Sequence, residues 1–239
     1  MNLETLAAHY QPNQSAQEVV RQSDTLLLVG ISGAGKDTIQ SCLLEKEGYH
    51  KIVTHTTRPP RENNGVLEQD GREYHFVSFE AMQLLLEEHE LIEVNHYGTQ
   101  YYGTSVEEFR IANASRAVAV GNIDVNGITS FRALAGDAVR ALFILPPSYE
   151  VWLQRLAARY SSPDELRRVF PERRQTAIDE LEHALGVPYY HFIINDELDR
   201  SVRVVDEIAH RRNVFNRHDD EARLLARDLL EAIQASPQL

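Results

Sequence analysis

Short apolar runs alternate with amphipathic segments along most of the chain. The apolar runs predict strands at 25–29, 51–54, 117–120, 141–145 and 191–194. Helical patterns begin at Asp37, Phe79, Ser148, Pro171 and Asp199, several of them with a capping residue or a first-turn proline. Strands that are apolar on both faces and joined by helices are typical of parallel sheets. The pattern therefore predicts an α/β fold, with a five-stranded parallel sheet flanked by helices.

Two polar stretches interrupt this alternation. Residues 56–102 are rich in Arg, Asn, Gly and Tyr and include a polar loop at 61–71, and residues 160–170 are polar and charged. Ligands bind at the carboxyl edge of open α/β sheets, so we interpret both stretches as insertions over that edge. The same interpretation divides the chain into an N-terminal extension at 1–23, a main domain at 24–206 and a C-terminal helical extension at 207–239.

The C-terminal extension carries an amphipathic helix. Within 219–234, Ala222, Leu225, Leu229 and Ile233 fall on one helical face. Two interpretations are open: the face packs on its own domain, or it forms a homodimer contact through the terminal helices.

Composition narrows the partners and the compartment. The chain has 24 Lys plus Arg against 36 Asp plus Glu, and its formal net charge of -12 would repel a nucleic-acid backbone over most of the surface. No apolar run approaches the roughly twenty residues of a membrane span, and residues 1–10 lack the features of a secretory signal. The single cysteine, Cys42, cannot form an internal disulfide, which agrees with a reducing compartment. We therefore expect a cytoplasmic protein with no nucleic-acid partner and no membrane partner.

A glycine-rich loop follows the first predicted strand. The residues GISGAGK at 30–36 fit the pattern G-x-x-x-x-G-K, directly after an apolar strand and directly before a helix. Such a loop wraps phosphate groups with its backbone N–H groups, the following helix presents its positive end, and Lys36 adds a mobile charge. The residues expected to contact a nucleotide polyphosphate are Gly30, Ser32, Gly33, Ala34, Gly35, Lys36, Asp37 and Thr38. One position departs from the pattern, because Asp37 replaces the Ser or Thr that usually binds magnesium.

The first polar stretch contains groups suited to a phosphorylated acceptor. Arg58 and Arg61 lie three apart after a predicted strand, and their guanidinium groups can grip a dianionic phosphate. The hydroxyls of Tyr74 and Tyr102 can donate hydrogen bonds to phosphate without adding charge. Glu93 can accept two hydrogen bonds from a guanine edge, whereas adenine offers no such pair of donors.

At these residues the chain resembles the guanylate kinase family. The resemblance extends from about residue 25 to residue 205 in unbroken motif order, through GISGAGKDT, HTTRPPR, DGREYHFVS, LIEVNHYGTQYYGTS, GNIDVNG, ALFILPPS and IINDELD. It implies a P-loop kinase that transfers a phosphoryl group from ATP to GMP, with Mg²⁺ bridging the ATP phosphates. It also implies that 56–102 is a GMP-binding insertion and that 160–170 is a mobile lid.

The resemblance implies a role for each matching residue. The GMP phosphate would be held by Arg58, Arg61, Tyr74 and Tyr102, and guanine would be recognised by Thr54, Glu93 and Thr104. Asp124 would lie near the GMP ribose and the metal site, so Asp37 and Asp124 are the candidate magnesium ligands. The residues that neutralise the transferring phosphoryl group would be Lys36, Arg155, Arg159 and Arg173 or Arg174, and Asn195 would lie near the ATP base.

Three features depart from the family pattern, and two other functions stay open. Asp37 replaces the P-loop hydroxyl, Asn122 replaces the first aspartate of a D-x-D pair, and the loop between Arg61 and Tyr74 is longer than usual. One alternative is a P-loop kinase of another phosphorylated acceptor, such as a ribosyl bisphosphate, which would have no base for Glu93 to recognise. The other alternative is a non-catalytic guanylate-kinase-like binding domain.

The histidines suggest no further chemistry. None of the ten lies at a spacing typical of a zinc site, so the sequence predicts no transition-metal site. His55, beside the predicted acceptor residues, is expected to be an exposed loop histidine.

Overall fold

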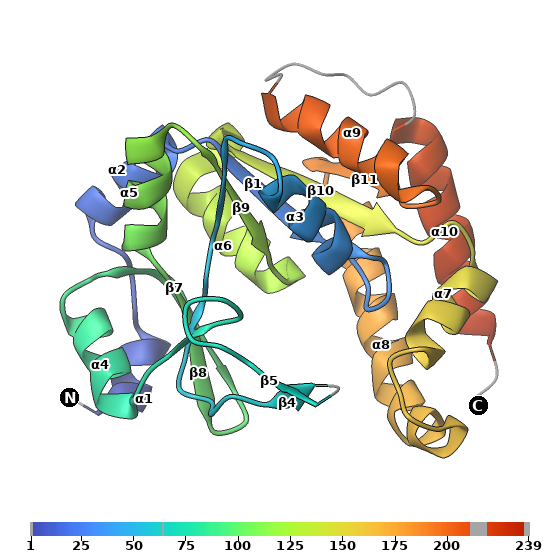
Figure 1. The fold of residues 1–239 in the computed structure, drawn as a ribbon, viewed down its shortest axis with the longest axis horizontal. Helices are drawn as coiled ribbons and strands as arrows, with labels where there is room; N and C mark the ends of the chain where they lie inside the picture. The colour runs from blue at the N-terminus through green and yellow to red at the C-terminus, as the bar shows by residue number, and fades with distance from the viewer. Residues whose placement is uncertain (1, 64, 211–218, 237–239) are drawn as a thin grey trace. The chain divides into compact units, whose positions relative to one another are not determined.

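The chain forms two multi-stranded sheets with helices around them (Figure 1). The computed structural model describes residues 2–63, 65–210 and 219–236. Its strands are β1 (Thr25–Val29), β2 (Tyr49–Lys51), β3 (His55–Thr56), β4 (Glu62–Asn63), β5 (Val66–Leu67), β6 (His75–Phe76), β7 (Leu91–Tyr97), β8 (Gln100–Ser105), β9 (Val118–Asn122), β10 (Val139–Leu145) and β11 (Tyr190–Ile194). Its helices are α1 (Leu3–Ala8), α2 (Gln14–Gln22), α3 (Lys36–Leu44), α4 (Phe79–Glu87), α5 (Val106–Ser115), α6 (Val125–Ala135), α7 (Tyr149–Ala157), α8 (Pro163–Gly186), α9 (Leu198–His210) and α10 (Asp219–Ala235), with a 3₁₀ turn at Gly136–Ala138. Among the described residues, no helix has the length and apolar character needed to cross a membrane.

The larger sheet has five strands in the order β11-β10-β1-β9-β2. The neighbours β10 and β11 pair in parallel, and so do β2 and β9. The strand β1 is buried along its whole length, as expected for a strand that is covered on both faces. The predicted α/β fold with a five-stranded parallel sheet is confirmed.

One predicted strand has the wrong bounds. The strand expected at 51–54 is β2 at Tyr49–Lys51, and the following residues lead to β3. Ile52 and Val53 are buried, and the N–H of Ile52 still donates to the carbonyl of Val120 at 2.9 Å. The apolar pattern at Ile52 and Val53 therefore reflects their burial, whereas β2 itself ends at Lys51.

The chain divides into two compact units, which are described separately below. Unit 1 comprises Met1–Thr25, Glu47–Gly121 and Thr129–Val139, and unit 2 comprises Leu26–Lys46, Asn122–Ile128 and Arg140–Leu239. The P-loop and the predicted lid belong to unit 2, and the predicted acceptor-binding residues from Thr54 to Thr104 belong to unit 1.

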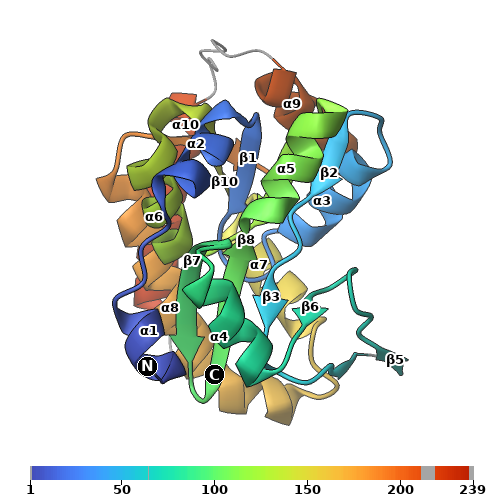
Figure 2. The same ribbon diagram turned by 90° about the vertical axis from the view of Figure 1, so that its left-hand side faces the viewer.

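Unit 1 contains the smaller sheet, which has four strands in the order β6-β3-β8-β7. The strands β7 and β8 form an antiparallel hairpin, β3 runs antiparallel to β8, and β6 pairs in parallel with β3 at the edge. The helices α1 and α4 pack together on one side of this sheet (Figure 2). The buried core on that side consists of Met82, Leu86, Leu91 and Tyr101, and residues of α1 pack against it.

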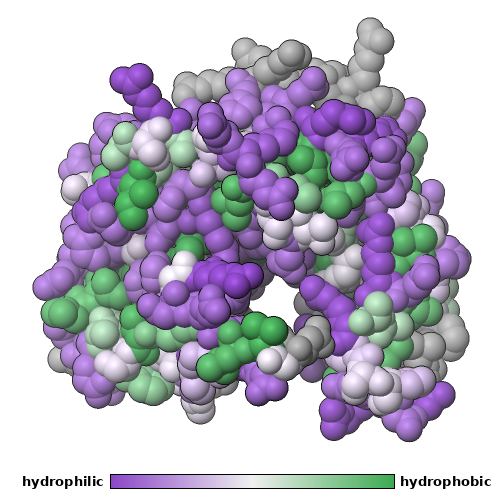
Figure 3. Space-filling view, in the orientation of Figure 1, coloured by the Kyte–Doolittle hydropathy of each residue, from purple (hydrophilic) through white to green (hydrophobic). Residues whose placement is uncertain are grey.

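The polar loop predicted at 61–71 contains a short hairpin formed by β4 and β5. Val66 and Leu67 in β5 are exposed, and they give the hairpin a hydrophobic spot on the face shown in Figure 3.

The helix predicted to begin at Pro171 begins much earlier, because α8 starts at Pro163 and Pro171 lies inside it. Ser162 caps the helix by accepting a hydrogen bond from the N–H of Glu165, and Pro163 occupies a first-turn position where no N–H is required. Pro171 removes one backbone hydrogen bond, but burial of the helix face on either side of it keeps α8 continuous. Residues 163–170, expected to interrupt the helices, are therefore helical.

The C-terminal helix α10 packs within unit 2, against α8 and β11. Its predicted apolar face is buried at Ala222, Leu229 and Ile233 and half-buried at Leu225. This face therefore packs on the chain's own fold, which is the first of the two interpretations.

Candidate functional site

The loop between β1 and α3 depends on three glycines. Gly30, Gly33 and Gly35 have φ angles of 138°, 87° and 98°, which residues with a side chain rarely adopt. A Cβ atom at Gly30 would collide with the carbonyl oxygen of Ile144, and one at Gly35 would collide with the side-chain amide of Asn195. The loop can lie this close to its neighbours only because these positions lack side chains.

Lys36 is the first residue of α3, and its ammonium group folds back over the loop. Nζ donates hydrogen bonds to the carbonyl oxygens of Gly30 and Ile31, the second at 3.3 Å. Burial lowers the pKa of Lys36, and the carboxylates of Glu180 and Asp37 oppose this effect. Anionic phosphate oxygens would compensate the buried charge better than neutral carbonyls do, so Lys36 is well placed to bind a phosphate.

Glu180 on α8 is a residue of this site that the sequence did not reveal. Burial raises the pKa of Glu180 to about 7, and the negative charge of Asp124 also raises it. The positive charges of Lys36 and Arg173 lower it. Its Oε2 atom is buried and has no hydrogen-bond partner among the described residues. Because Glu180 is one of several acidic residues on a polar helix, no sequence pattern distinguished it.

Two predicted lid arginines contact the P-loop. Arg155 on α7 donates from Nη1 to the carbonyl of Ala34 in the loop at 3.5 Å and from Nη2 to the carbonyl of Asn195 at 3.0 Å. Arg159, just past the end of α7, donates from Nη1 to Ser32 Oγ at 2.8 Å and pairs with Asp37 at 3.3 Å. Both guanidinium groups therefore lie where a polyphosphate held by the loop would meet them.

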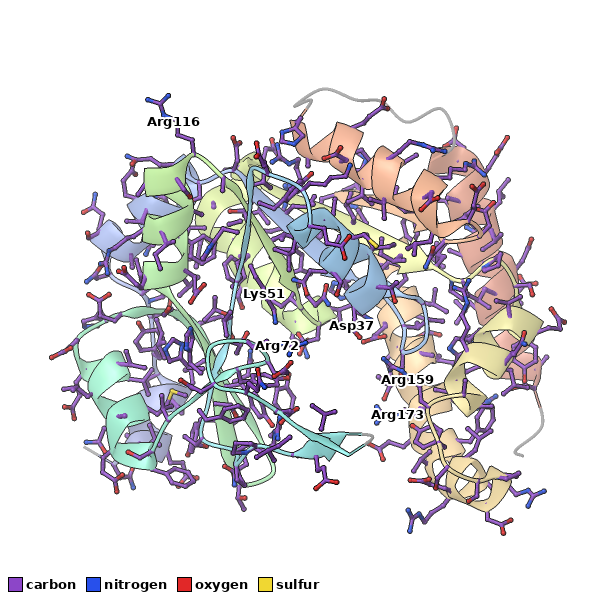
Figure 4. The ribbon with its side chains drawn as sticks, viewed as in Figure 1. Asp37, Lys51, Arg72, Arg116, Arg159 and Arg173 are labelled. Atoms are coloured by element: carbon purple, nitrogen blue, oxygen red, sulfur yellow. The ribbon has the colours of Figure 1, made fainter. Side chains whose placement is uncertain are left out.

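These groups line a cavity of about 450 Å³ within unit 2. The lining residues are Gly33, Gly35, Asp37, Thr38, Arg155, Arg159, Asn195, Asp196 and Leu198. Figure 4 shows Asp37 and Arg159 on one side of unit 2, with Arg173 beside them. The volume is typical of a small-molecule site. The sequence predicted most of this lining but missed Asp196 and Leu198.

Trp152 and Asn195 hold the P-loop in place through its backbone carbonyls. The buried indole of Trp152 donates from Nε1 to the carbonyl of Ser32 at 2.9 Å, and the side-chain amide of Asn195 donates to the carbonyl of Ala34 at 2.8 Å. Trp152 was not predicted, because an aromatic residue on an amphipathic helix signals only a core position. With two carbonyls fixed in this way, the orientation of the loop is set.

The two departures from the expected P-loop kinase pattern contact each other. Asn122, at the end of β9, donates from Nδ2 to Oδ1 of Asp37 at 2.7 Å. The Asp37 side chain is 73% exposed, whereas Oδ1 of Asn122 is buried and has no partner among the described residues. Asp124 accepts a hydrogen bond from the N–H of Gly127 at 2.7 Å and so caps α6.

These oxygen atoms suit magnesium better than a softer metal. Asp37 offers an exposed carboxylate, and Asn122 offers a buried carbonyl oxygen without a donor. Across the described part of the chain, no group of three or more His, Cys, Asp or Glu side chains could hold a metal ion. A magnesium ion here would therefore need phosphate oxygens and water to complete its ligands.

Of the two alternative arginines on α8, Arg174 has a structural role. It donates from Nε to the carbonyl of Ile233 at 2.9 Å and from Nη2 to that of Gln234 at 2.5 Å, at the end of α10. Helix C-terminal carbonyls attract cations, which explains this contact. Arg173 is exposed and donates to the hydroxyl of Tyr160 at 3.1 Å, so of these two arginines Arg173 stays the candidate for the lid role.

In unit 1, the predicted acceptor residues gather on one face of the smaller sheet. Side chains alternate between the two faces of a strand, so the strand register identifies the residues that share a face. The face that we call the acceptor face carries Thr54, Thr56, Tyr74, Phe76, Glu93, Asn95, Tyr102 and Thr104.

Glu93 is held on the acceptor face by two neutral donors. Its Oε1 accepts a hydrogen bond from Thr104 Oγ1 at 2.7 Å, and its Oε2 accepts one from Asn95 Nδ2. The residue is only 9% exposed. Asn95 was not predicted, because an amide beside a strand carboxylate has no distinctive pattern. The arrangement fixes a carboxylate whose lone pairs can accept further hydrogen bonds from a ligand.

Arg58 packs against aromatic rings at the other end of the acceptor face. Its guanidinium carbon lies 5.1 Å from the ring centre of Tyr74 and 5.8 Å from that of Phe76. The rings of Tyr74 and Tyr102 are 6.1 Å apart, edge to face. The structure thus brings Arg58, Tyr74 and Tyr102 together as predicted.

Glu68, in the long loop, was not predicted, and it engages the guanidinium group of Arg58. Its two carboxylate oxygens lie 2.9 and 3.1 Å from Nη1 and Nη2 of Arg58, and one of them accepts from the N–H of Arg61 at 2.8 Å. The side chain of Arg61 is exposed. A carboxylate is the side-chain group most similar to phosphate in this geometry, so an acceptor phosphate would have to compete with Glu68.

The prediction for His55 is wrong. It lies in β3 rather than in an exposed loop, it is half-buried, and its ring centre is 4.6 Å from that of His75. Alternation along β3 places it on the reverse face of the sheet, behind Thr54 and Thr56.

With this geometry established, comparison with known proteins identifies the family. The sequence profile of the family described as guanylate kinase matches residues 22–212. The chain belongs to the guanylate kinase family. The guanylate kinase of Neisseria gonorrhoeae is 35% identical over 182 residues, which cover 76% of this chain and 84% of that protein. The guanylate kinase of Rhodospirillum rubrum is 33% identical over 198 residues, which cover 82% of this chain and 87% of that protein.

The fold also matches a solved member of the guanylate kinase family. The crystal structure of guanylate kinase from Anaplasma phagocytophilum superposes with a TM-score of 0.57 and 24% sequence identity. The match covers 84% of this chain and 94% of that chain. Helices α1 and α10 lie outside the residues that match the guanylate kinase profile.

Proposed function

We propose that this protein transfers a phosphoryl group from ATP to GMP, giving ADP and GDP. The observation that carries the proposal is the buried carboxylate of Glu93, fixed by Thr104 and Asn95 on the acceptor face, where Arg58 packs against Tyr74. A carboxylate in this position pairs with the two adjacent N–H donors of guanine, and adenine lacks that pair. The relatives named guanylate kinase support the same substrate.

The donor residues support ATP as the phosphoryl donor. The positive φ angles of the P-loop glycines allow backbone N–H groups to face a polyphosphate, and Lys36 and Arg159 would neutralise its charge. Arg155 and Arg173 would add positive charge as the lid closes. Phosphoryl transfer needs positioning and charge neutralisation rather than a protein nucleophile, because the attacking oxygen belongs to the GMP phosphate.

Asp37 and Asn122 would hold Mg²⁺ together with the ATP phosphates, directly or through water, with Asp124 nearby in the chain. When bound, the ion supplies charge neutralisation to the β and γ phosphates. This assignment requires only the oxygen donors described above.

The alternatives predict different substrates. A ribosyl bisphosphate has no base, so it would offer Glu93 nothing to recognise, and the contact would add nothing to its binding. A non-catalytic domain would bind GMP but release no ADP. We therefore propose an ADP-release assay with GMP, dGMP, AMP, UMP and ribose bisphosphate as acceptors.

The matched variants for this assay are Glu93→Gln and, as an exposed control on α4, Glu87→Gln. We expect GMP to exceed AMP by up to about 10⁴-fold in kcat/KM for the wild type, because a site built for polar edges rejects analogues that lack them. Glu93→Gln should weaken GMP use by about 10- to 100-fold and leave the KM for ATP unchanged. Equal use of AMP and GMP by the wild type would show that Glu93 does not recognise guanine.

A further inference from the structure

A buried ionisable cluster lies on the reverse face of the smaller sheet, and the proposed reaction does not use it. Its centre is Glu108, in the first turn of α5, whose side chain is 6% exposed. Glu108 accepts a hydrogen bond from His50 Nε2 at 2.9 Å and another, on its second oxygen, from His75 Nε2 at 3.0 Å. One buried carboxylate therefore engages two imidazoles with both of its oxygens.

Glu108 is stabilised in its ionised form. Burial opposes ionisation, but hydrogen bonds from His50, His75 and the backbone of Val53 outweigh it and hold the pKa of Glu108 below its ordinary value. An ionised carboxylate makes stronger hydrogen bonds than a neutral one, and in a buried position these bonds are costly to lose.

The partners of Glu108 belong to unit 1 but lie in strands of two different sheets. His50 lies in β2 of the larger sheet, and His75 lies in β6 of the smaller sheet. The chain leaves the larger sheet through residues 52–54, and it leaves the smaller sheet at Ser105, directly before α5. Glu108 thus connects the two places where the chain passes between the sheets.

The edge strand β6 needs this attachment. It has only two residues, and its backbone bonds to β3 run from the N–H of His75 to Thr54 and from that of Val77 to Thr56, both at 2.9 Å. So short an edge strand is weakly held by its backbone alone. The bond from His75 to Glu108 therefore anchors β6 from the reverse face, where the ring of His55 also packs against His75.

Tyr74 directly precedes His75 and faces the opposite side, toward Arg58. A shift of His75 would therefore move the tyrosine ring that supports the guanidinium group of Arg58. Both groups belong to the end of the acceptor face that we assign to the acceptor phosphate.

We propose that Glu108 is a positioning residue: through His75 it holds β6, and with it Tyr74 and Arg58, in the geometry that binds the acceptor phosphate. The proposal rests on the proposed function, because it takes the acceptor face to be the GMP site. Glu108 itself touches no substrate.

The test compares Glu108→Ala and Glu108→Gln with Glu107→Gln, a neighbouring glutamate whose side chain is 60% exposed. The KM for GMP, the KM for ATP and kcat are measured for each, together with the Kd for GMP by calorimetry without ATP. We expect Glu108→Ala to raise the KM and Kd for GMP roughly 2- to 30-fold, the range usual for a residue that acts through a neighbour. Glu108→Gln should raise the KM and Kd for GMP less than Glu108→Ala does, because it keeps one acceptor oxygen. Glu107→Gln should have the wild-type values.

A purely structural role would give a different result. It would lower the unfolding midpoint and the active fraction, and so lower kcat, while the KM and Kd for GMP stayed at the wild-type values; that result would overturn the proposal. If Glu108→Ala does not fold, His75→Phe, which keeps an aromatic ring but has no donor for Glu108, breaks the same contact and must show the same selective loss of GMP affinity. If the wild type neither binds nor phosphorylates GMP, the proposed function fails and this proposal fails with it. An active wild type with unchanged GMP affinity in the variants overturns the positioning role alone.

Discussion

We predict that Asp37 and Asn122 act as a pair. The test replaces each of them with the residue usual in the family, first one at a time and then together. In the wild type, the Asn122 amide donates to the Asp37 carboxylate at 2.7 Å. Asn122→Asp places a second carboxylate at that position, and Asp37→Ser removes the only carboxylate of the pair. The double variant has a single carboxylate again, at the end of β9 instead of the start of α3.

The distance sets the size of the effect of Asn122→Asp. Two unit charges at this separation repel by about 1.5 kcal/mol in bulk water and by about 6 kcal/mol at an effective dielectric constant near 20. Because the Asp37 side chain is 73% exposed, the lower end of this range applies. The lost hydrogen bond adds about 1 kcal/mol, so we expect Asn122→Asp to lose about 2 to 3 kcal/mol of unfolding free energy in EDTA.

Magnesium should reduce the loss of unfolding free energy in Asn122→Asp. A magnesium ion between two carboxylates converts their repulsion into attraction, so Asn122→Asp should recover stability when Mg²⁺ is added. The double variant should resemble the wild type in EDTA. The assays are urea unfolding and calorimetric ATP binding, each with Mg²⁺ and with EDTA, and Asp137→Ser is an exposed control outside the site.

Two results would refute this reasoning. If Asp37→Ser binds ATP with the same magnesium dependence as the wild type, Asp37 has no part in holding the metal. If the double variant is as unstable in EDTA as Asn122→Asp, the two positions do not act as a pair. Higher activity in Asp37→Ser than in the wild type would indicate a weakened or regulated enzyme.

Two further predictions concern arginines. Arg58→Ala should weaken GMP binding by about 10- to 100-fold in calorimetry, because it removes a charge-assisted phosphate contact. Glu68→Gln should strengthen GMP binding, because it removes a carboxylate that competes with the phosphate. Unchanged affinity in Arg58→Ala would contradict the phosphate role. Arg174→Ala should lower the free energy of unfolding by about 1 to 3 kcal/mol in urea titrations, because it loses hydrogen bonds to the end of α10. Its kcat should stay unchanged. A loss of kcat as large as that of Arg173→Ala would instead show that Arg174 belongs to the site.

The features that the sequence predicted well are those set by local rules. The P-loop glycines need positive φ angles at fixed positions, and a lysine must follow them at the start of a helix, so the motif and its geometry coincide. Glu93 and Thr104 were found because the order of motifs in a known family located them. Their contact across two paired strands follows from the register of β7 and β8.

The features that the sequence missed depend on contacts between distant segments. Glu68 contacts Arg58 only because the long loop folds back as a hairpin, and Glu180 faces the P-loop from a helix far along the chain. The continuous helix through Pro171 was missed for another reason. Pro171 alone predicts a helix start, but Ser162 and Pro163 give a stronger start signal that lies within the polar stretch.

The contact between Asp37 and Asn122 also bears on whether the site is active. Independent loss of a hydroxyl at one position and of a carboxylate at the other would leave no reason for the two new side chains to match. Here they match in both charge and geometry, since the amide donates to the carboxylate, which also pairs with Arg159 at the edge of the cavity. Compared with the family pattern, this pair has its one carboxylate at the start of α3 instead of at the end of β9. This arrangement would keep one anionic oxygen ligand near the expected phosphates, as the proposed magnesium site requires, and it favours a kinase over a domain that only binds nucleotide.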